Sequence, residues 1–253
     1  PELAQEWEWI DDTHLILKLN KNVRFSNGTP LTAEDVVFTL NRARSTDPTV
    51  SKISGTISLI ADVTALDDYT VQLTTSTFTN EMIYSLCAYP LSIQSKKAWE
   101  DPSIKEPWLI GTGPYKLKEW KEGQYVTFEK VENYWNEANN PATAKEITFM
   151  FLLEASQRAI ALQNGEIDVC IDPPTTDLKF LADDPNITVH TQAGTRLFYM
   201  GFNVEKAPFD NVKLRQAVSC AIDKEAIIDI VLDGRGKWQT SVLNRGAWSF
   251  LDN

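Results

Sequence analysis

The sequence predicts a mixed fold, α/β with α+β character, in which mixed sheets carry flanking helices. Over residues 1–145, short runs alternate apolar and polar residues, which is the pattern of half-buried strands. From Ile147 onward, apolar runs alternate with helical patterns, an order that packs helices on a sheet with some parallel or mixed pairing. Pro, Gly, Asn and Asp separate the runs, as expected for turns.

The first predicted elements are a strand, a turn and a helix. Residues 15–19 place leucine at every second position, so they predict a strand with one buried face. Asn27-Gly28 supplies a turn, and Thr32 followed by Asp35 is close to a capping box that begins a helix. Apolar residues follow at helical spacing, namely Val36, Val37, Leu40 and Ala43.

A hairpin is the most informative prediction of the chain. Gly111 and Gly113 tolerate a turn conformation, and residues 115–120 then alternate in polarity. The sequence Lys121-Glu122-Gly123-Gln124 forms a turn, and residues 125–130 run back. Between the first helix and this hairpin, the patterns predict strands over residues 57–65, 69–74 and 91–94 and a short helix over residues 81–88.

The second half of the chain predicts alternating strands and helices. A helix beginning at Glu154 is stopped by Gly165, which suits the position after a helix end. Two later helices are separated near Asp223. Short apolar runs predict strands over residues 147–152, 167–171, 187–190 and 197–202, with a short helix over residues 178–182.

Composition excludes several classes of protein. A net charge of −11 without a basic stripe argues against nucleic-acid binding, and no run of eighteen apolar residues is present to span a membrane. Cys87, Cys170 and Cys220 stand far apart in apolar settings, so we expect buried free thiols, although one disulfide stays open. His14 and His190 offer little material for a metal cluster, and no metal or cofactor is expected.

Four blocks, in order, carry a family resemblance: residues 3–43, 111–135, 154–174 and 203–236. Together they closely resemble the family 5 solute-binding proteins of ABC importers, which include dipeptide, oligopeptide and nickel-binding receptors. The resemblance implies a periplasmic-binding-protein-like type II fold. Because family members are about twice as long, it also implies an incomplete fold, a fragment lacking an N-terminal segment and a large C-terminal portion.

The resemblance also implies a division into lobes. Residues 1–145 correspond to a peripheral lobe, and residues 146–221 to part of the first ligand-facing lobe. Residues 222–253 correspond to the start of the second ligand-facing lobe. In the family, the ligand binds between the two ligand-facing lobes, which close like a hinged clamp.

Candidate ligand contacts lie in the strand predicted near residues 196–203. Tyr199 matches a family position where a tyrosine often touches ligand, with core packing as the alternative. Alternation sends Met200 to the opposite face, and Gly201 allows another backbone to approach.

A tryptophan-flanked loop is the second candidate. Trp238 and Trp248 offer large apolar faces suited to a pocket wall, with packing beneath the loop as the alternative for Trp248. The loop departs from its relatives at Asn244 and Arg245, where they commonly carry prolines. Lys213 and Arg215 are expected in ion pairs, not in ligand binding.

The resemblance implies a non-catalytic function, the capture of peptides or similar small solutes for delivery to the membrane subunits of an ABC permease. It implies a monomer in the periplasm or outside the cell, either free or lipid-anchored. A metal chelate, an opine or an oligosaccharide stays open as the ligand. A signalling module would instead expose apolar patches on residues 1–145. A hydrolase is disfavoured because no catalytic motif occurs.

Overall fold

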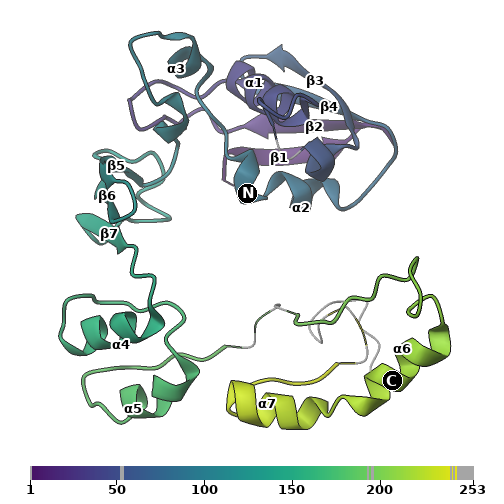
Figure 1. Cartoon of the computed structure of the whole chain (residues 1–253). Helices are drawn as coiled ribbons and strands as arrows, with labels where there is room; N and C mark the ends of the chain where they lie inside the picture. Colours follow the sequence, from purple (N-terminus) through teal and green to yellow (C-terminus); the bar gives the residue numbers. More distant parts are fainter. Residues whose placement is uncertain are drawn as a thin grey trace. The chain divides into compact units, whose positions relative to one another are not determined.

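The computed structural model describes residues 2–51, 54–192, 194, 197–239, 241 and 243. The chain divides into two compact units, Pro1–Phe151 and Leu152–Asn253, called unit 1 and unit 2 below (Figure 1).

Unit 1 begins with a four-stranded antiparallel sheet and one covering helix (Figure 1). The strand order is β1-β2-β4-β3, and β1 and β3 are its edges. Helix α1 (Ala33–Arg44) contacts β3 and β4. The strands are β1 (Ala4–Trp9), β2 (His14–Leu19), β3 (Ile60–Asp67) and β4 (Thr70–Thr75).

A buried carboxylate fixes the start of α1. Asp35 is only 5% exposed, and its Oδ2 accepts the backbone N–H of Thr32 at 2.9 Å, which confirms the predicted capping interaction. Its Oδ1 accepts the backbone N–H of Lys96 at 2.8 Å. The Thr39 hydroxyl, one turn further on, accepts the backbone N–H of Gln94 at 2.9 Å. The helix start is therefore tied to residues some sixty positions away.

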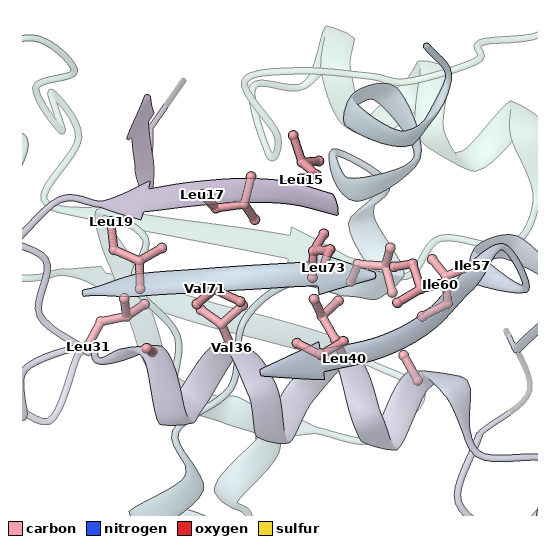
Figure 2. Close-up of a cluster of buried hydrophobic side chains, with 14 of the residues drawn as sticks. Leu15, Leu17, Leu19, Leu31, Val36, Leu40, Ile57, Ile60, Val71 and Leu73 are labelled. Atoms are coloured by element: carbon pink, nitrogen blue, oxygen red, sulfur yellow. The ribbon is translucent and has the colours of Figure 1, made fainter. Parts of the chain in front are cut away.

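The core of unit 1 lies between this sheet and α1 (Figure 2). Val36 and Leu40 of α1 face Val71 and Leu73 of β4, and all four side chains are buried. Leu15, on β2, is fully buried beside Leu73, its register partner. Since burying one such side chain contributes about 1.5–3 kcal/mol, this cluster dominates the stability of the unit.

The predicted hairpin is confirmed as part of a second antiparallel sheet. Its strands, in the order β5-β6-β7, are β5 (Tyr115–Lys121), β6 (Tyr125–Lys130) and β7 (Glu146–Met150). Gly123 takes a φ of +71° in the turn between β5 and β6, a conformation that side chains resist. Lys116 of β5 forms an ion pair with Glu129 of the neighbouring β6 at 3.1 Å, and Lys118 of β5 forms one across the sheet with Glu146 of β7.

Short helices occur in the connections of unit 1, the first between α1 and β3 and the others between the two sheets. They are a 3₁₀ helix (Ser54–Ile57), α2 (Met82–Leu86), a 3₁₀ helix (Tyr89–Leu91), α3 (Lys96–Glu100) and a 3₁₀ helix (Pro107–Leu109).

Two strand predictions in this region need correction. The strand expected from residue 57 begins at Ile60, because Ile57 ends a 3₁₀ helix and anchors it in the core. The strand expected over residues 91–94 is absent, because Gln94 gives its N–H to a threonine side chain on α1 instead of to a neighbouring strand.

Unit 2 is built of helices in its described residues: α4 (Ala155–Gln163), a 3₁₀ helix (Thr175–Asp177), α5 (Leu178–Ala182), α6 (Val212–Ala221) and α7 (Lys224–Leu232). Gly165, at φ +71°, ends α4 as predicted, and Glu166 donates its N–H back to the Ala161 carbonyl at 2.9 Å. The predicted break near Asp223 is also confirmed, because its carboxylate accepts the N–H of Ala226 at the start of α7.

The strands predicted over residues 167–171, 187–190 and 197–202 are absent from the described part of unit 2. A helix closes its hydrogen bonds within its own segment, whereas a strand needs a neighbouring strand. The first and last of these segments expose large apolar side chains, such as Val169 and Phe198. These apolar side chains are therefore left largely uncovered within the described part of unit 2.

The three cysteines are free thiols, as expected, but the prediction that they are buried is wrong. Cys87 and Cys220 are exposed, and Cys170 is half-buried. The apolar neighbours of Cys170, Val169 and Ile171, are themselves exposed, so they do not report on the environment of that thiol.

Candidate functional site

The predicted ligand contacts near Tyr199 lie on an uncovered segment of unit 2. Tyr199 is 83% exposed and Met200 is 62% exposed. Gly201 has open space around it, since an added Cβ would meet Tyr199 Cε2 at 3.9 Å and no described backbone. Phe202 turns back and packs on Phe209, with ring centroids 5.1 Å apart. The segment thus presents a tyrosine and a methionine while anchoring itself through a phenylalanine pair.

An arginine, which the sequence reasoning did not single out, organises the beginning of unit 2. The guanidinium of Arg158, on α4, donates to the carbonyls of Leu152 at 2.8 Å, Leu153 at 3.1 Å and Asp172 at 2.9 Å. These carbonyls precede α4 and follow it, so one side chain fixes both ends of the segment. No local sequence signal marks this role, because it depends on where the chain returns.

Trp238 follows a tightly folded helix end. Asp233 and Gly234 both take positive φ after α7, and Gly236 packs so closely on the helix that an added Cβ would lie 2.9 Å from Leu232 Cδ1. Trp238 is half-exposed at this point. Trp248, Asn244 and Arg245 lie outside the described residues. Trp238 follows α7 by a few residues in the chain, and the role of the two tryptophans as pocket walls stays a prediction.

The prediction that Arg215 forms an ion pair is wrong. Its Nη1 donates to the backbone carbonyls of Phe209 at 2.6 Å and Asp210 at 3.2 Å, and none of the ion pairs among the described residues includes it. The arginine therefore caps the segment that leads into α6.

Two open depressions occur on unit 1, and none of the predicted contact residues lines either one. The first, of about 660 Å³, is dominated by charged side chains, namely Glu6, Lys18, Lys21, Asp67 and Asp68. Backbone N–H donation from Tyr69, followed by a side-chain hydrogen bond with Thr70, lowers the pKa of Asp67. The second depression, of about 680 Å³, is lined mainly by carboxamides.

The part of the chain that the structure describes contains neither a candidate metal centre nor a candidate membrane helix. No group of three or more His, Cys, Asp or Glu side chains there is arranged to hold a metal ion. No described helix combines the length and the apolar character needed to cross a bilayer.

The fold is that of type II periplasmic binding proteins. The ABC transporter-associated periplasmic binding protein DppA from Helicobacter pylori, solved in complex with the peptide STSA, matches with a TM-score of 0.86 and 25% identity. The match covers 99% of this chain and 53% of that chain. Residues 1–253 match the bacterial extracellular solute-binding proteins, family 5 Middle, so the protein belongs to this family. The description of this family places its members outside the cytoplasm.

The names of the curated relatives refer to more than one kind of ligand. Heme-binding protein A of Haemophilus influenzae is 31% identical over 275 residues, covering 100% of this chain and 50% of the relative. Di/tripeptide-binding protein 1 of Pseudomonas aeruginosa is 30% identical, covering 99% of this chain and 50% of the relative. The chain thus spans about half the length of the curated relatives it matches.

Proposed function

We propose that the protein is the solute-binding component of an ABC importer. It captures a peptide or a similar small solute outside the cytoplasmic membrane and delivers it to the membrane subunits of the permease. The observation that carries this proposal is the family match over residues 1–253, joined to a fold like that of a peptide-bound importer component. Function is then a binding equilibrium coupled to closure of two lobes.

The proposal keeps the division into lobes that the family resemblance implies. Residues 1–145 form the peripheral lobe and residues 146–221 belong to the first ligand-facing lobe. Residues 222–253 begin the second ligand-facing lobe. The protein works as a monomer, either free in the periplasm or lipid-anchored, and it has no nucleic-acid partner and no cofactor.

Ligand is held in part by Tyr199, Met200 and Gly201, with Trp238 and Trp248 as walls of the second lobe. The exposure of Tyr199 and Met200 supports this role, because an aromatic and a flexible thioether left uncovered are suited to contact a varied ligand. Gly201 leaves room for a ligand backbone to come close.

The protein catalyses no reaction on this proposal. Capture and release need complementary surfaces and a hinge, and neither requires a nucleophile or a general base. The family is a solute-binding family, which supports this part of the proposal.

A metal chelate is the second candidate ligand. The relative from Haemophilus influenzae is named for heme, an iron chelate with a flat apolar ring system. Exposed aromatic side chains such as Tyr199 and Trp238 suit such a ring as well as they suit a peptide. An opine or an oligosaccharide is a further alternative for the same cleft.

Calorimetric titration of the natural protein, of which this sequence is at least a part, tests the proposal. A panel of dipeptides and tripeptides is titrated first by calorimetry. Hemin binding is then followed by absorbance. We expect peptide binding that Tyr199→Ala weakens about tenfold or more, as for a contact at the centre of a site. Tyr84→Ala is the matched control, because Tyr84 is 79% exposed on α2 of unit 1.

Three results bear against parts of this proposal. Binding of hemin without any peptide would replace the leading ligand by the second one. Binding of neither would overturn both ligand assignments. Equal affinities of the Tyr199→Ala and Tyr84→Ala variants would remove Tyr199 from the site while leaving the function intact.

A further inference from the structure

The second depression of unit 1 has an unusual chemical lining. Five of its side chains are carboxamides, namely Gln5, Asn20, Asn136, Asn139 and Asn140. Trp135 and Glu2 complete it. Two stretches that lie more than one hundred residues apart in the sequence therefore meet around a space of about 680 Å³.

Backbone and indole hydrogen bonds hold the walls of this depression in place. The backbone N–H of Asn20 donates to the carbonyl of Leu3 at 2.8 Å, which fixes Asn20 beside the beginning of β1. The indole Nε1 of Trp135 donates to the carbonyl of Thr112 at 2.9 Å. Part of the Trp135 ring packs on the core of unit 1, and the ring also lines the depression. The aromatic wall is therefore set by the folded unit.

The asparagines are arranged by a compact turn. The backbone N–H groups of Asn139 and Asn140 both donate to the carbonyl of Asn136, at 3.1 Å and 2.9 Å. The Asn139 side chain donates to the Asn136 side chain at 2.9 Å. Because Asn139 and Asn140 are exposed and already ordered, they can bind a ligand with little further loss of conformational entropy.

This chemistry suits a ligand with many hydroxyl groups. Each carboxamide offers two donors and one acceptor, and a hydroxyl group can satisfy either kind. The carboxylate of Glu2 adds an acceptor, and the Trp135 ring offers a flat apolar face to the C–H side of a sugar ring. The other depression of unit 1, with Lys18, Lys21 and Asp67, lacks this combination and is dominated by charges.

We propose that the depression lined by Trp135 and the five carboxamides binds a saccharide. It lies on unit 1, and its residues differ from those proposed to hold the transported solute. The proposal therefore goes beyond solute capture and gives the protein a second ligand of a different chemical class.

Calorimetric titration of the natural protein with maltotriose, cellobiose and N,N′-diacetylchitobiose at millimolar concentration tests this. We expect at least one of the three to bind. The double change Asn139→Ala with Asn140→Ala removes two carboxamides at exposed positions, so the affinity should fall about tenfold or more. Gln5→Ala, at an exposed position on β1, is a second variant that keeps the test valid if the turn fails to fold. Gln124→Ala, in the exposed turn between β5 and β6, is the matched control.

Dipeptide binding, measured on the same variants, should stay unchanged and should not compete with the saccharide. The absence of binding by all three saccharides overturns the proposal. Saccharide binding that survives the double change and Gln5→Ala also overturns it, because the sugar would then lie elsewhere, as in the solute cleft. Neither result bears on peptide capture, which is measured separately.

Discussion

Unit 1 and unit 2 are held together in different ways. Unit 1 contains two antiparallel sheets and buries a continuous cluster of apolar side chains around Leu15, Leu73 and Leu40. In the described residues of unit 2, the buried apolar side chains are Ala159, Ala161 and Leu181, and polar ties such as that of Arg158 organise the chain. The comparison shows that a helix can form from residues close in sequence, because its hydrogen bonds lie within one segment. A sheet with a hydrophobic core requires segments that are distant in sequence to pack together.

The largest difference is expected for core leucines. Leu73→Ala should lower the free energy of unfolding by about 3 kcal/mol, because a cavity opens between β4 and α1. Leu181→Ala, in unit 2, should cost at least about 1 kcal/mol less, because Leu181 lies outside that cluster and its surroundings can collapse. Urea unfolding of both variants measures this, with half-exposed Leu66→Ala as the surface control. Equal costs at positions 73 and 181 would break the comparison.

The buried cap of α1 should come next. Asp35→Ala removes the acceptor for two backbone N–H groups and should destabilise unit 1 by about 2 kcal/mol. The neighbouring change Glu34→Ala breaks an exposed ion pair with Lys96 and should alter stability by less than about 1 kcal/mol. Chemical denaturation of the two variants separates the contributions, and a similar cost for both would contradict the assigned role of Asp35.

In unit 2 the corresponding test is Arg158→Ala. Loss of its hydrogen bonds to three carbonyls should loosen α4 by about 1–2 kcal/mol. Amide hydrogen exchange of residues 155–163 reports this directly. Lys179→Ala, which removes an exposed ion pair with Asp183, is the control and should leave exchange in α4 unchanged. Unchanged exchange in the Arg158 variant would mean that unit 2 has another source of order.

The smallest effect concerns Asp11, between β1 and β2. Hydrogen bonds from the Thr13 backbone N–H and then from the His14 side chain hold the pKa of Asp11 at about 2, below its ordinary 3.8. Because the folded pKa is lowered, this stabilisation is present above the ordinary value and is lost as the pH falls through the folded pKa. A carboxyl NMR titration should find a midpoint near 2. The difference in stability between the protein and its Asp11→Asn variant should shrink as the pH falls from 3.8 toward 2. An ordinary midpoint would contradict the hydrogen-bonded turn.

Local chemistry made much of unit 1 predictable. The alternation of leucines in β2, the Thr32 and Asp35 cap and the turn at Gly123 each act through neighbours in sequence, and all three are confirmed. The predicted start of β3 is three residues too early, because the contribution of Ile57 to the core depends on a 3₁₀ turn that no residue pattern marks.

The rest could not be predicted, because it depends on contacts distant in sequence. The segments over residues 167–171 and 197–202 are apolar enough for strands, yet pairing is a property of two segments and not of one. For the same reason, the Arg158 clamp and the depression beside Trp135 emerge only from the folded chain. Of the candidate contacts, Tyr199 rests on the family resemblance and Met200 on its place in the same predicted strand, and their exposure agrees with a surface role without testing it.

Hydrogen exchange of the natural protein with and without a bound dipeptide tests the central claim most directly. The account predicts that peptide binding slows exchange over residues 197–203, where Tyr199 and Met200 are uncovered in the free chain. The four-stranded sheet of unit 1 should exchange equally in both states. Peptide binding that leaves residues 197–203 unprotected would contradict the placement of the ligand at Tyr199 and Met200.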